Sequence, residues 1–320
     1  MAIGLITTPA SWANRTVVTP TWLQNVQDTI NHLLSTAYCG DASDGNVTIS
    51  AGTTTLTRDI YYNDLTITAG TLVTNGWCVY VKGTFTWSGG AITCNGAAGA
   101  AGAAGATQGG RTSAVGPHMG GPGAAGSQTA TQPNIPASLL GLGGAGGGGG
   151  TSGGAGGLPG ALLTNGTTDK RYKIPPFRGA YVAPSTYGIS TSPTYSSVTN
   201  ASFGGGSGGG GGRGDGTRQG GCGGEAGGLI FVIARTVVIT GAPTASATGG
   251  AGGNGEASGN CGAGGGGGGG AGILLYGTLS GTPPTITVTG GSAGTPTGTG
   301  GGGGNGNAGA SAFKTHQFGA

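Results

Sequence analysis

Charge is scarce in this sequence. Only 7% of its 320 residues are charged, and the formal net charge is +3. So small a charge spread over so long a chain argues against a nucleic acid as the principal partner. No apolar run approaches the eighteen or so residues of a membrane-spanning helix, so we expect no membrane insertion. The first fifteen residues lack the pattern of a signal peptide, which predicts assembly in a cytoplasm.

The residue patterns of catalytic and metal sites are also lacking. The five cysteines form no C-x-x-C pair, and we expect them to be buried as small apolar side chains. The three histidines lie far apart, and the nine carboxylates are spread thinly without a histidine beside them. These absences predict a protein that is not an enzyme and that needs no metal and no cofactor. Two carboxylates brought together by folding remain possible, so a glycan-depolymerising spike stays open as an alternative.

Glycine dominates what is there. The chain has 82 glycines and 15 prolines, a composition in which disorder is the usual expectation. The 35% hydrophobic content and the low charge contradict that expectation, because disordered chains are usually polar and charged. The long glycine runs are therefore predicted to be ordered parts of the fold.

A single segment near the start has a helical pattern. Thr19 is a suitable N-cap, Pro20 occupies the first helical position, and apolar residues follow at intervals of three and four. The segment predicts a helix that attaches or oligomerises the chain, with a homotrimer expected. The alternative is a helix packed on its own domain. The residues assigned to attachment or oligomerisation are Trp22, Leu23, Val26, Ile30 and Leu33.

Strand patterns follow the helical segment. Residues 46–93 contain short stretches rich in threonine, valine and isoleucine, separated by glycine turns. A unit of apolar strand, turn, second strand and glycine-rich tail begins at Trp77, at Leu229 and at Ile273. A strand pair alone leaves an apolar face exposed, so the three units predict β repeats that stack on one another.

The predicted fold class is mainly β with extended polyglycine II helices. A short N-terminal helix, stacked β repeats and a glycine-rich sandwich would make up the chain. The predicted divisions are an attachment segment at 1–40, a β module at 41–95 and a glycine-rich body at 96–320. Strand repeats at 229–240 and 273–289 belong to that body.

Two stretches, 107–140 and 165–203, interrupt the glycine-rich body. The second is rich in tyrosine and serine and carries four of the twelve basic residues, a composition typical of recognition surfaces. The alternative is an aromatic cover over the stacked strands. Arg213 and Asp215, in an Arg-Gly-Asp triplet, are expected to point into water from an edge of the body. The receptor-binding candidates are Tyr172, Phe177, Arg178, Tyr181, Tyr187 and Tyr195.

Two segments resemble known virion proteins. "RTVVTPTWLQNVQDTI" at 15–30 resembles the N-terminal leader of tailed-bacteriophage fibres, and residues 44–85 resemble a β module of phage tail-associated proteins. The glycine-rich remainder is similar in kind to phage tail-tip adhesins built on polyglycine II. The resemblance implies a virion location, attachment to other virion proteins through the N-terminus, and distal loops that contact a receptor.

The sequence thus predicts a phage tail fibre or adhesin involved in host attachment. Its receptor would be a bacterial surface glycan or an outer-membrane protein. The alternatives are a structural head or tail decoration without a receptor role, and the depolymerising spike.

Overall fold

The computed structural model describes residues 39–103, 119–120, 123–127, 206 and 208–315. The predicted attachment helix, most of the stretch at 107–140 and the whole of 165–203 lie outside these residues. No helix within the described part is long and apolar enough to cross a membrane.

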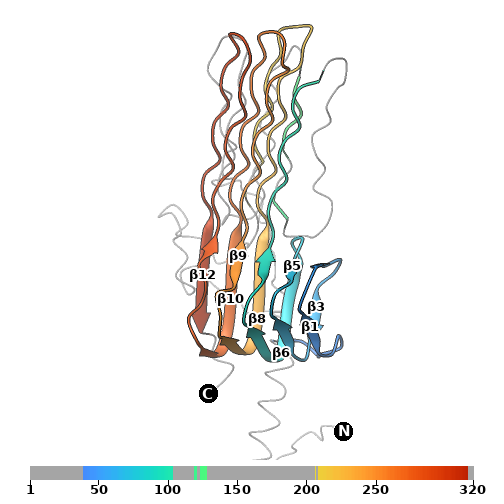
Figure 1. Ribbon diagram of the computed structural model, residues 1–320, viewed down its shortest axis with the longest axis vertical. Coiled ribbons are helices and arrows are strands. Elements are labelled where there is room, and N and C mark those ends of the chain that lie inside the picture. The colour runs from blue at the N-terminus through green and yellow to red at the C-terminus, as the bar shows by residue number, and fades with distance from the viewer. Residues whose placement is uncertain (1–38, 104–118, 121–122, 128–205, 207, 316–320) are drawn as a thin grey trace, which may run out of the picture.

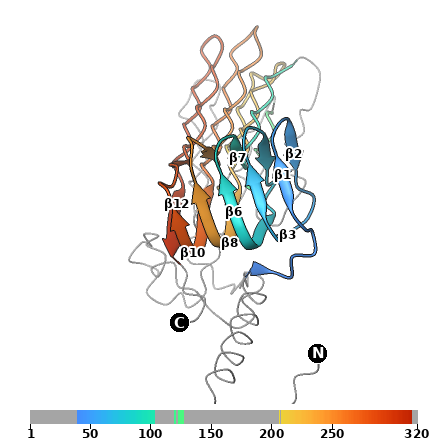
Figure 2. The ribbon, with the colours of Figure 1, turned by 60° about the horizontal axis from the view of Figure 1, so that its bottom comes forward.

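Two parallel sheets form the base of the described structure (Figures 1 and 2). Every strand pair in them is parallel. The larger sheet, called sheet A here, contains β1 (Val47–Ile49), β3 (Ile60–Tyr62), β4 (Leu65–Ile67), β6 (Cys78–Trp87), β8 (Leu229–Ile239), β10 (Ala271–Ser280) and β12 (Ala310–Thr315). Sheet B contains β2 (Thr53–Thr55), β5 (Thr71–Val73), β7 (Ala91–Thr93), β9 (Thr244–Ser246) and β11 (Ile286–Thr287).

The chain alternates between the sheets. From β6 it turns a corner at Gly89 and Gly90 and enters β7 in sheet B. Gly90 has a φ of +68°, which side-chain-bearing residues rarely adopt. The corner directs the two strands of one unit into different sheets, so they face each other across the core.

The three repeated units lie side by side. Cys78 of β6 is in register with Phe231 of β8, which is in register with Ile273 of β10. In sheet B the second strands β7, β9 and β11 are likewise neighbours. Each unit is therefore one coil of a solenoid, with its hydrogen bonds made to the coils before and after it.

A core of apolar side chains fills the space between the sheets. Leu65, Val79 and Phe85 of sheet A are fully buried, as is Leu72 of sheet B. Trp87 stacks on Phe85, with ring centroids 5.5 Å apart. Alternate residues of each strand supply this core because successive side chains point to opposite faces.

Glycine-rich legs extend from one end of the sheets (Figure 1). The rising legs at 94–103, 247–256 and 288–297 continue strands of sheet B. The returning legs at 219–228, 261–270 and 300–309 lead into β8, β10 and β12 of sheet A. Two outer legs at 119–127 and 206–214 are described in part and lie against the returning legs.

Each leg is held by its neighbours through backbone hydrogen bonds. In the leg at 219–228, every third amide donates to the same neighbouring leg. Gly221 donates to Gly262 at 3.0 Å and Gly224 donates to Gly265 at 2.9 Å. The next residue in each triplet donates to the leg at 94–103, as Cys222 does to Ala100 at 2.9 Å. These bonds pair the buried backbone groups between legs, since the legs form no helical bonds within themselves.

Glycine is required by this close approach. A Cβ atom at Gly224 would overlap the carbonyl group of Gly250, and one at Gly267 would overlap that of Glu225. The same holds for most glycines of the buried legs. Side chains in these positions would push the legs apart and break the bonds between them.

The predicted fold class is wrong. Among the described residues the regular structure is two parallel sheets, with no polyglycine II helix and no α-helical residue beyond Cys39. The expected stacking of strand pairs is also corrected, because the two strands of a unit join separate sheets. The physical reason is that the hydrogen bonds of strands and legs are made between segments that are separate in the sequence, such as Cys78 with Phe231 and Gly224 with Gly265, and a local pattern does not reveal these pairs.

Two alanine substitutions test the close approach of the legs. Gly224→Ala is expected to lower the free energy of unfolding by about 3 kcal/mol, because its methyl group meets backbone that cannot move aside. Gly302→Ala is the matched control, since a Cβ there meets nothing within 4 Å. The control is expected to change stability by about 1 kcal/mol or less. Equal effects in denaturant unfolding would contradict the packing described here.

Candidate functional site

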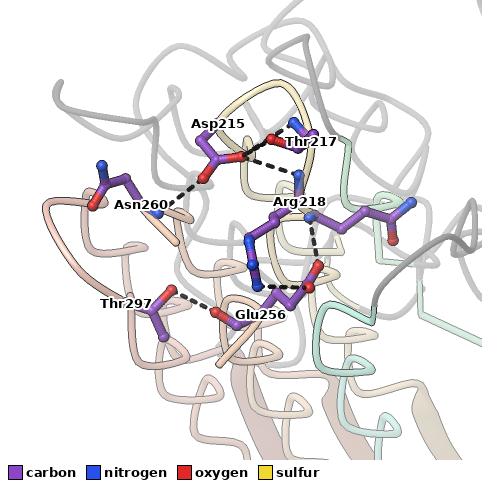
Figure 3. A network of polar contacts seen from close by, with 7 residues as sticks. Asp215, Thr217, Arg218, Glu256, Asn260 and Thr297 are labelled. Atoms are coloured by element: carbon purple, nitrogen blue, oxygen red, sulfur yellow. Dashed lines mark hydrogen bonds and ion pairs between the residues drawn. The ribbon is translucent and has the colours of Figure 1, made fainter. Parts of the chain in front are cut away.

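Charged side chains of the glycine legs gather at their far end. The described legs and the turns between them carry five charged residues, of which only Glu225 lies away from the far end of its leg. The other four are Arg213, Asp215, Arg218 and Glu256, in or next to the turns at the end opposite to the sheets (Figure 1), and Figure 3 shows the last three. We call this end the tip and define it as residues 213–219, 256–260 and 297–300.

The tip consists of three turns that join legs. Each turn contains one glycine with positive φ, namely Gly216 at +104°, Gly259 at +116° and Gly298 at +57°. Such angles favour glycine and allow each leg to reverse within a few residues. The polar side chains are thereby presented beside one another in successive turns.

Asp215 organises the first turn and binds the second. Its Oδ1 accepts hydrogen bonds from the amide of Arg218 at 3.0 Å and from the amide of Thr217 at 3.1 Å. Its Oδ2 accepts the amide of Asn260 at 3.2 Å (Figure 3). One carboxylate therefore fixes the shape of its own turn and its distance from the next.

Glu256 forms the second link between these turns. Its Oε2 accepts the amide of Gln219 at 3.0 Å, and its Oε1 lies 3.4 Å from a guanidinium nitrogen of Arg218. The side chain of Glu256 is 9% exposed and that of Arg218 is 39% exposed. The ion pair is therefore partly shielded from water, while Arg218 keeps a surface for a ligand.

The third turn is tied to the second. The hydroxyl of Thr297 donates to the carbonyl of Glu256 at 2.7 Å, and the amide of Thr299 donates to Oδ1 of Asn260 at 2.9 Å. Together with the contacts of Asp215, these bonds make the three turns one connected polar surface. Arg213, Asp215, Thr217, Asn260 and Thr299 are exposed on it.

Hydrogen bonding keeps Asp215 ionised. The amides of Thr217, Asn260 and Arg218, in that order of importance, lower the pKa of its carboxyl below the ordinary aspartate value. Because the pKa in the folded state is lowered, this stabilisation is present above the ordinary value of about 3.9 and is lost as the pH falls through the lowered pKa. Asp215 is accordingly an acceptor at neutral pH and a poor proton donor.

The other described carboxylates are used in the same way. Each of the seven described carboxylates, Asp215 included, accepts at least one backbone amide. The part of the chain that the structure describes contains no group of three potential ligands that could hold a metal. The acceptors are Asp41, Asp44, Asp59, Asp64, Asp215, Glu225 and Glu256.

Most of the site residues predicted from the sequence are not part of the tip. The receptor-binding candidates between Tyr172 and Tyr195 and the attachment residues between Trp22 and Leu33 lie outside the described residues and stay predictions. Arg213 and Asp215 are exposed as expected, although the carboxylate of Asp215 also binds protein amides.

The sequence contains a long-range repeat that indicates the tip, although no short motif does. Asp215, Glu256 and Thr297 follow one another at intervals of 41 residues. Each stands in a short polar interruption of a glycine run. A repeat that places polar residues at equal intervals brings them to one end of a solenoid, because successive coils lie side by side.

No family model, no curated protein and no solved structure matches this chain. The case for a function therefore depends on the sequence resemblance and on the geometry of the tip.

Removal of the Asp215 carboxylate is expected to loosen the first turn. Asp215→Ala deprives the amides of Thr217, Arg218 and Asn260 of their acceptor, so trypsin should cut after Arg218 about fivefold faster at neutral pH. Asp41→Ala is the matched control, since that exposed carboxylate binds an amide near the sheets. Mass spectrometry of timed digests measures both rates. An unchanged rate in Asp215→Ala would show that the turn does not depend on this carboxylate.

Proposed function

We propose that this protein is a virion fibre or adhesin of a tailed bacteriophage that contacts a bacterial surface receptor through its tip. The observation that carries the proposal is the gathering of charged side chains at the far end of glycine legs that elsewhere carry only Glu225. The legs are suited to a spacer, because an extended chain of ten residues spans at most about 35 Å. The tip is then the part of the described body with side chains that can recognise a ligand.

The chemistry of the tip suits a polar ligand. Arg213 and Arg218 supply guanidinium donors, and Asp215 and Asn260 supply acceptors close to exposed hydroxyl and amide groups. Alternating donors and acceptors on a surface of this kind complement sugar hydroxyls or a polar loop of an outer-membrane protein. A bacterial surface glycan or such a protein loop is the proposed ligand class.

A hydrolytic role is less well supported by the same residues. Cleavage of a glycan requires one carboxyl group that stays protonated to act as an acid. The bonds of Asp215 lower its pKa, and Glu256 is occupied by a backbone amide and by Arg218. The proposal is therefore a binding protein without enzymatic activity.

The attachment end is proposed from the sequence resemblance. The described chain begins beside sheet A, and the N-terminal segment would join it to other virion proteins, with a homotrimer as the proposed assembly. A decoration of the head or tail without receptor contact is the competing role. The two roles differ in whether the isolated protein binds cells of the host.

Arginine substitutions test whether the receptor is bound by the tip or by another part of the molecule. Arg213→Ser is expected to weaken binding of the labelled protein to host cells at least about tenfold, as exposed arginines often dominate interfaces. Arg235→Ser is the matched control, because this exposed arginine lies in β8, away from the tip. Its binding should stay within about twofold of the unmodified protein.

Flow cytometry on host cells and on a resistant derivative measures these affinities. Equal binding to both cell types would contradict specific receptor contact. A loss of binding in Tyr172→Ser or Tyr181→Ser with none in Arg213→Ser would move receptor contact to the tyrosine-rich stretch. No binding by the unmodified protein would favour the decoration.

A further inference from the structure

Sheet A has a second apolar face, turned away from sheet B. In the halves of β6, β8 and β10 next to the legs, alternate side chains point outward and are not part of the core between the sheets. They are nevertheless buried, with Tyr80 and Ile233 at 0% exposure and Phe231 at 1%. We call Cys78, Tyr80, Leu229, Phe231, Ile233, Ile273 and Leu275 the outer patch.

Aromatic packing agrees with this burial. Tyr80 stacks on Tyr61 with ring centroids 5.0 Å apart and meets Phe231 edge to face at 6.1 Å. Burial is the main cause that raises the pKa of the Tyr80 hydroxyl and that of the Cys78 thiol. The patch is thus a dry interior and not a solvated surface.

Of the described residues, Tyr61 covers part of this patch through its contact with Tyr80. Sheet B packs on the opposite face of sheet A, and the legs extend away from the ends of the sheets (Figure 1). Near β3, Gly40 lies against the ring of Tyr61. The outward positions of sheet B need no cover, since they are mainly threonine and serine, such as Thr53 and Thr244.

The ends of the outer legs lead to the patch. Ser127 lies level with the tip, because its amide donates to Gly212 and its carbonyl accepts from Gly214. Gly206 lies at the sheet end of the legs, where its amide donates to Gly227 at 2.8 Å. Residues 128–205 therefore connect the tip to the beginning of sheet A.

The hydrogen bonds of the outer leg at 206–214 also show on which face of sheet A this leg lies. The outer leg at 206–214 bonds to the returning legs at 219–228 and 261–270, through Gly209 to Gly224 and Gly265 to Gly210. These two returning legs run directly into β8 and β10. Gly206 thus lies at the end of the sheet beside the outward side chains of β8 and β10, which form the centre of the patch.

We propose that the tyrosine-rich segment at 165–203 packs on the outer patch as a permanent third layer of the fold. Its six aromatic residues, four of them tyrosines, provide the large apolar area that such a face requires, and the tyrosine hydroxyls can stay at the rim. This assignment is independent of the proposed receptor contact at the tip. It gives the segment a structural role within its own chain.

Thiol labelling tests the proposal in the full chain. The deletion of residues 165–203 leaves residues 128–164 to connect the tip with Gly206. Cys78 of the outer patch should then react with a maleimide at least about tenfold faster than in the intact protein, since its cover is gone. Cys94 is the internal control, because it faces the core between the sheets and should stay protected.

Other covers give different results. Faster labelling of Cys78 after deletion of residues 1–37, with no change after deletion of 165–203, would overturn the proposal in favour of the N-terminal segment. Labelling of the intact protein that rises on dilution would overturn it in favour of a second copy of the chain.

A second measurement on an intact chain covers the case in which the deletion unfolds the protein and exposes both thiols. A photo-reactive benzoylphenylalanine in place of Phe231 should cross-link to peptides from 165–203. Cross-links to any other segment, to a second chain, or to none would overturn the proposal.

Discussion

The hydrogen bond between the backbones of neighbouring glycine legs is the interaction on which the rest of the structure depends. Each buried leg is bonded on several sides by legs far away in the sequence, and these bonds form because no Cβ atoms separate the backbones. Ordering a glycine costs more backbone entropy than ordering any other residue. The many bonds formed together are what offsets this cost, so the legs are ordered as a set or not at all.

The two sheets give the legs their starting positions. Rising legs continue sheet B and returning legs lead into sheet A, so the register of the strands is carried into the legs. Cys94 shows the continuity, because it follows β7 directly and its amide donates to Ser246 at the end of β9. The tip depends on the same register, since Asp215, Glu256 and Thr297 meet only if successive coils have nearly equal lengths.

Part of this architecture is readable from the sequence. The strand character of residues 46–93 and the three units that begin at Trp77, Leu229 and Ile273 follow from β-branched residues and glycine turns. The parallel pairing does not follow, because a unit of two strands with a short turn is equally compatible with a hairpin. The polar contacts of the tip join residues about forty positions apart, and only the 41-residue interval indicates them.

Hydrogen–deuterium exchange of the legs tests the central claim most directly. If the legs are bonded to one another as described, the amides of the returning legs at 219–228 and 261–270 exchange at least about a thousandfold more slowly than those of a free glycine peptide. The exposed turn residues Ala257 and Ser258 exchange rapidly in the same experiment. Exchange of both legs at the rate of the free peptide would show that the glycine runs are not bonded to one another, and the tip would then have no fixed support.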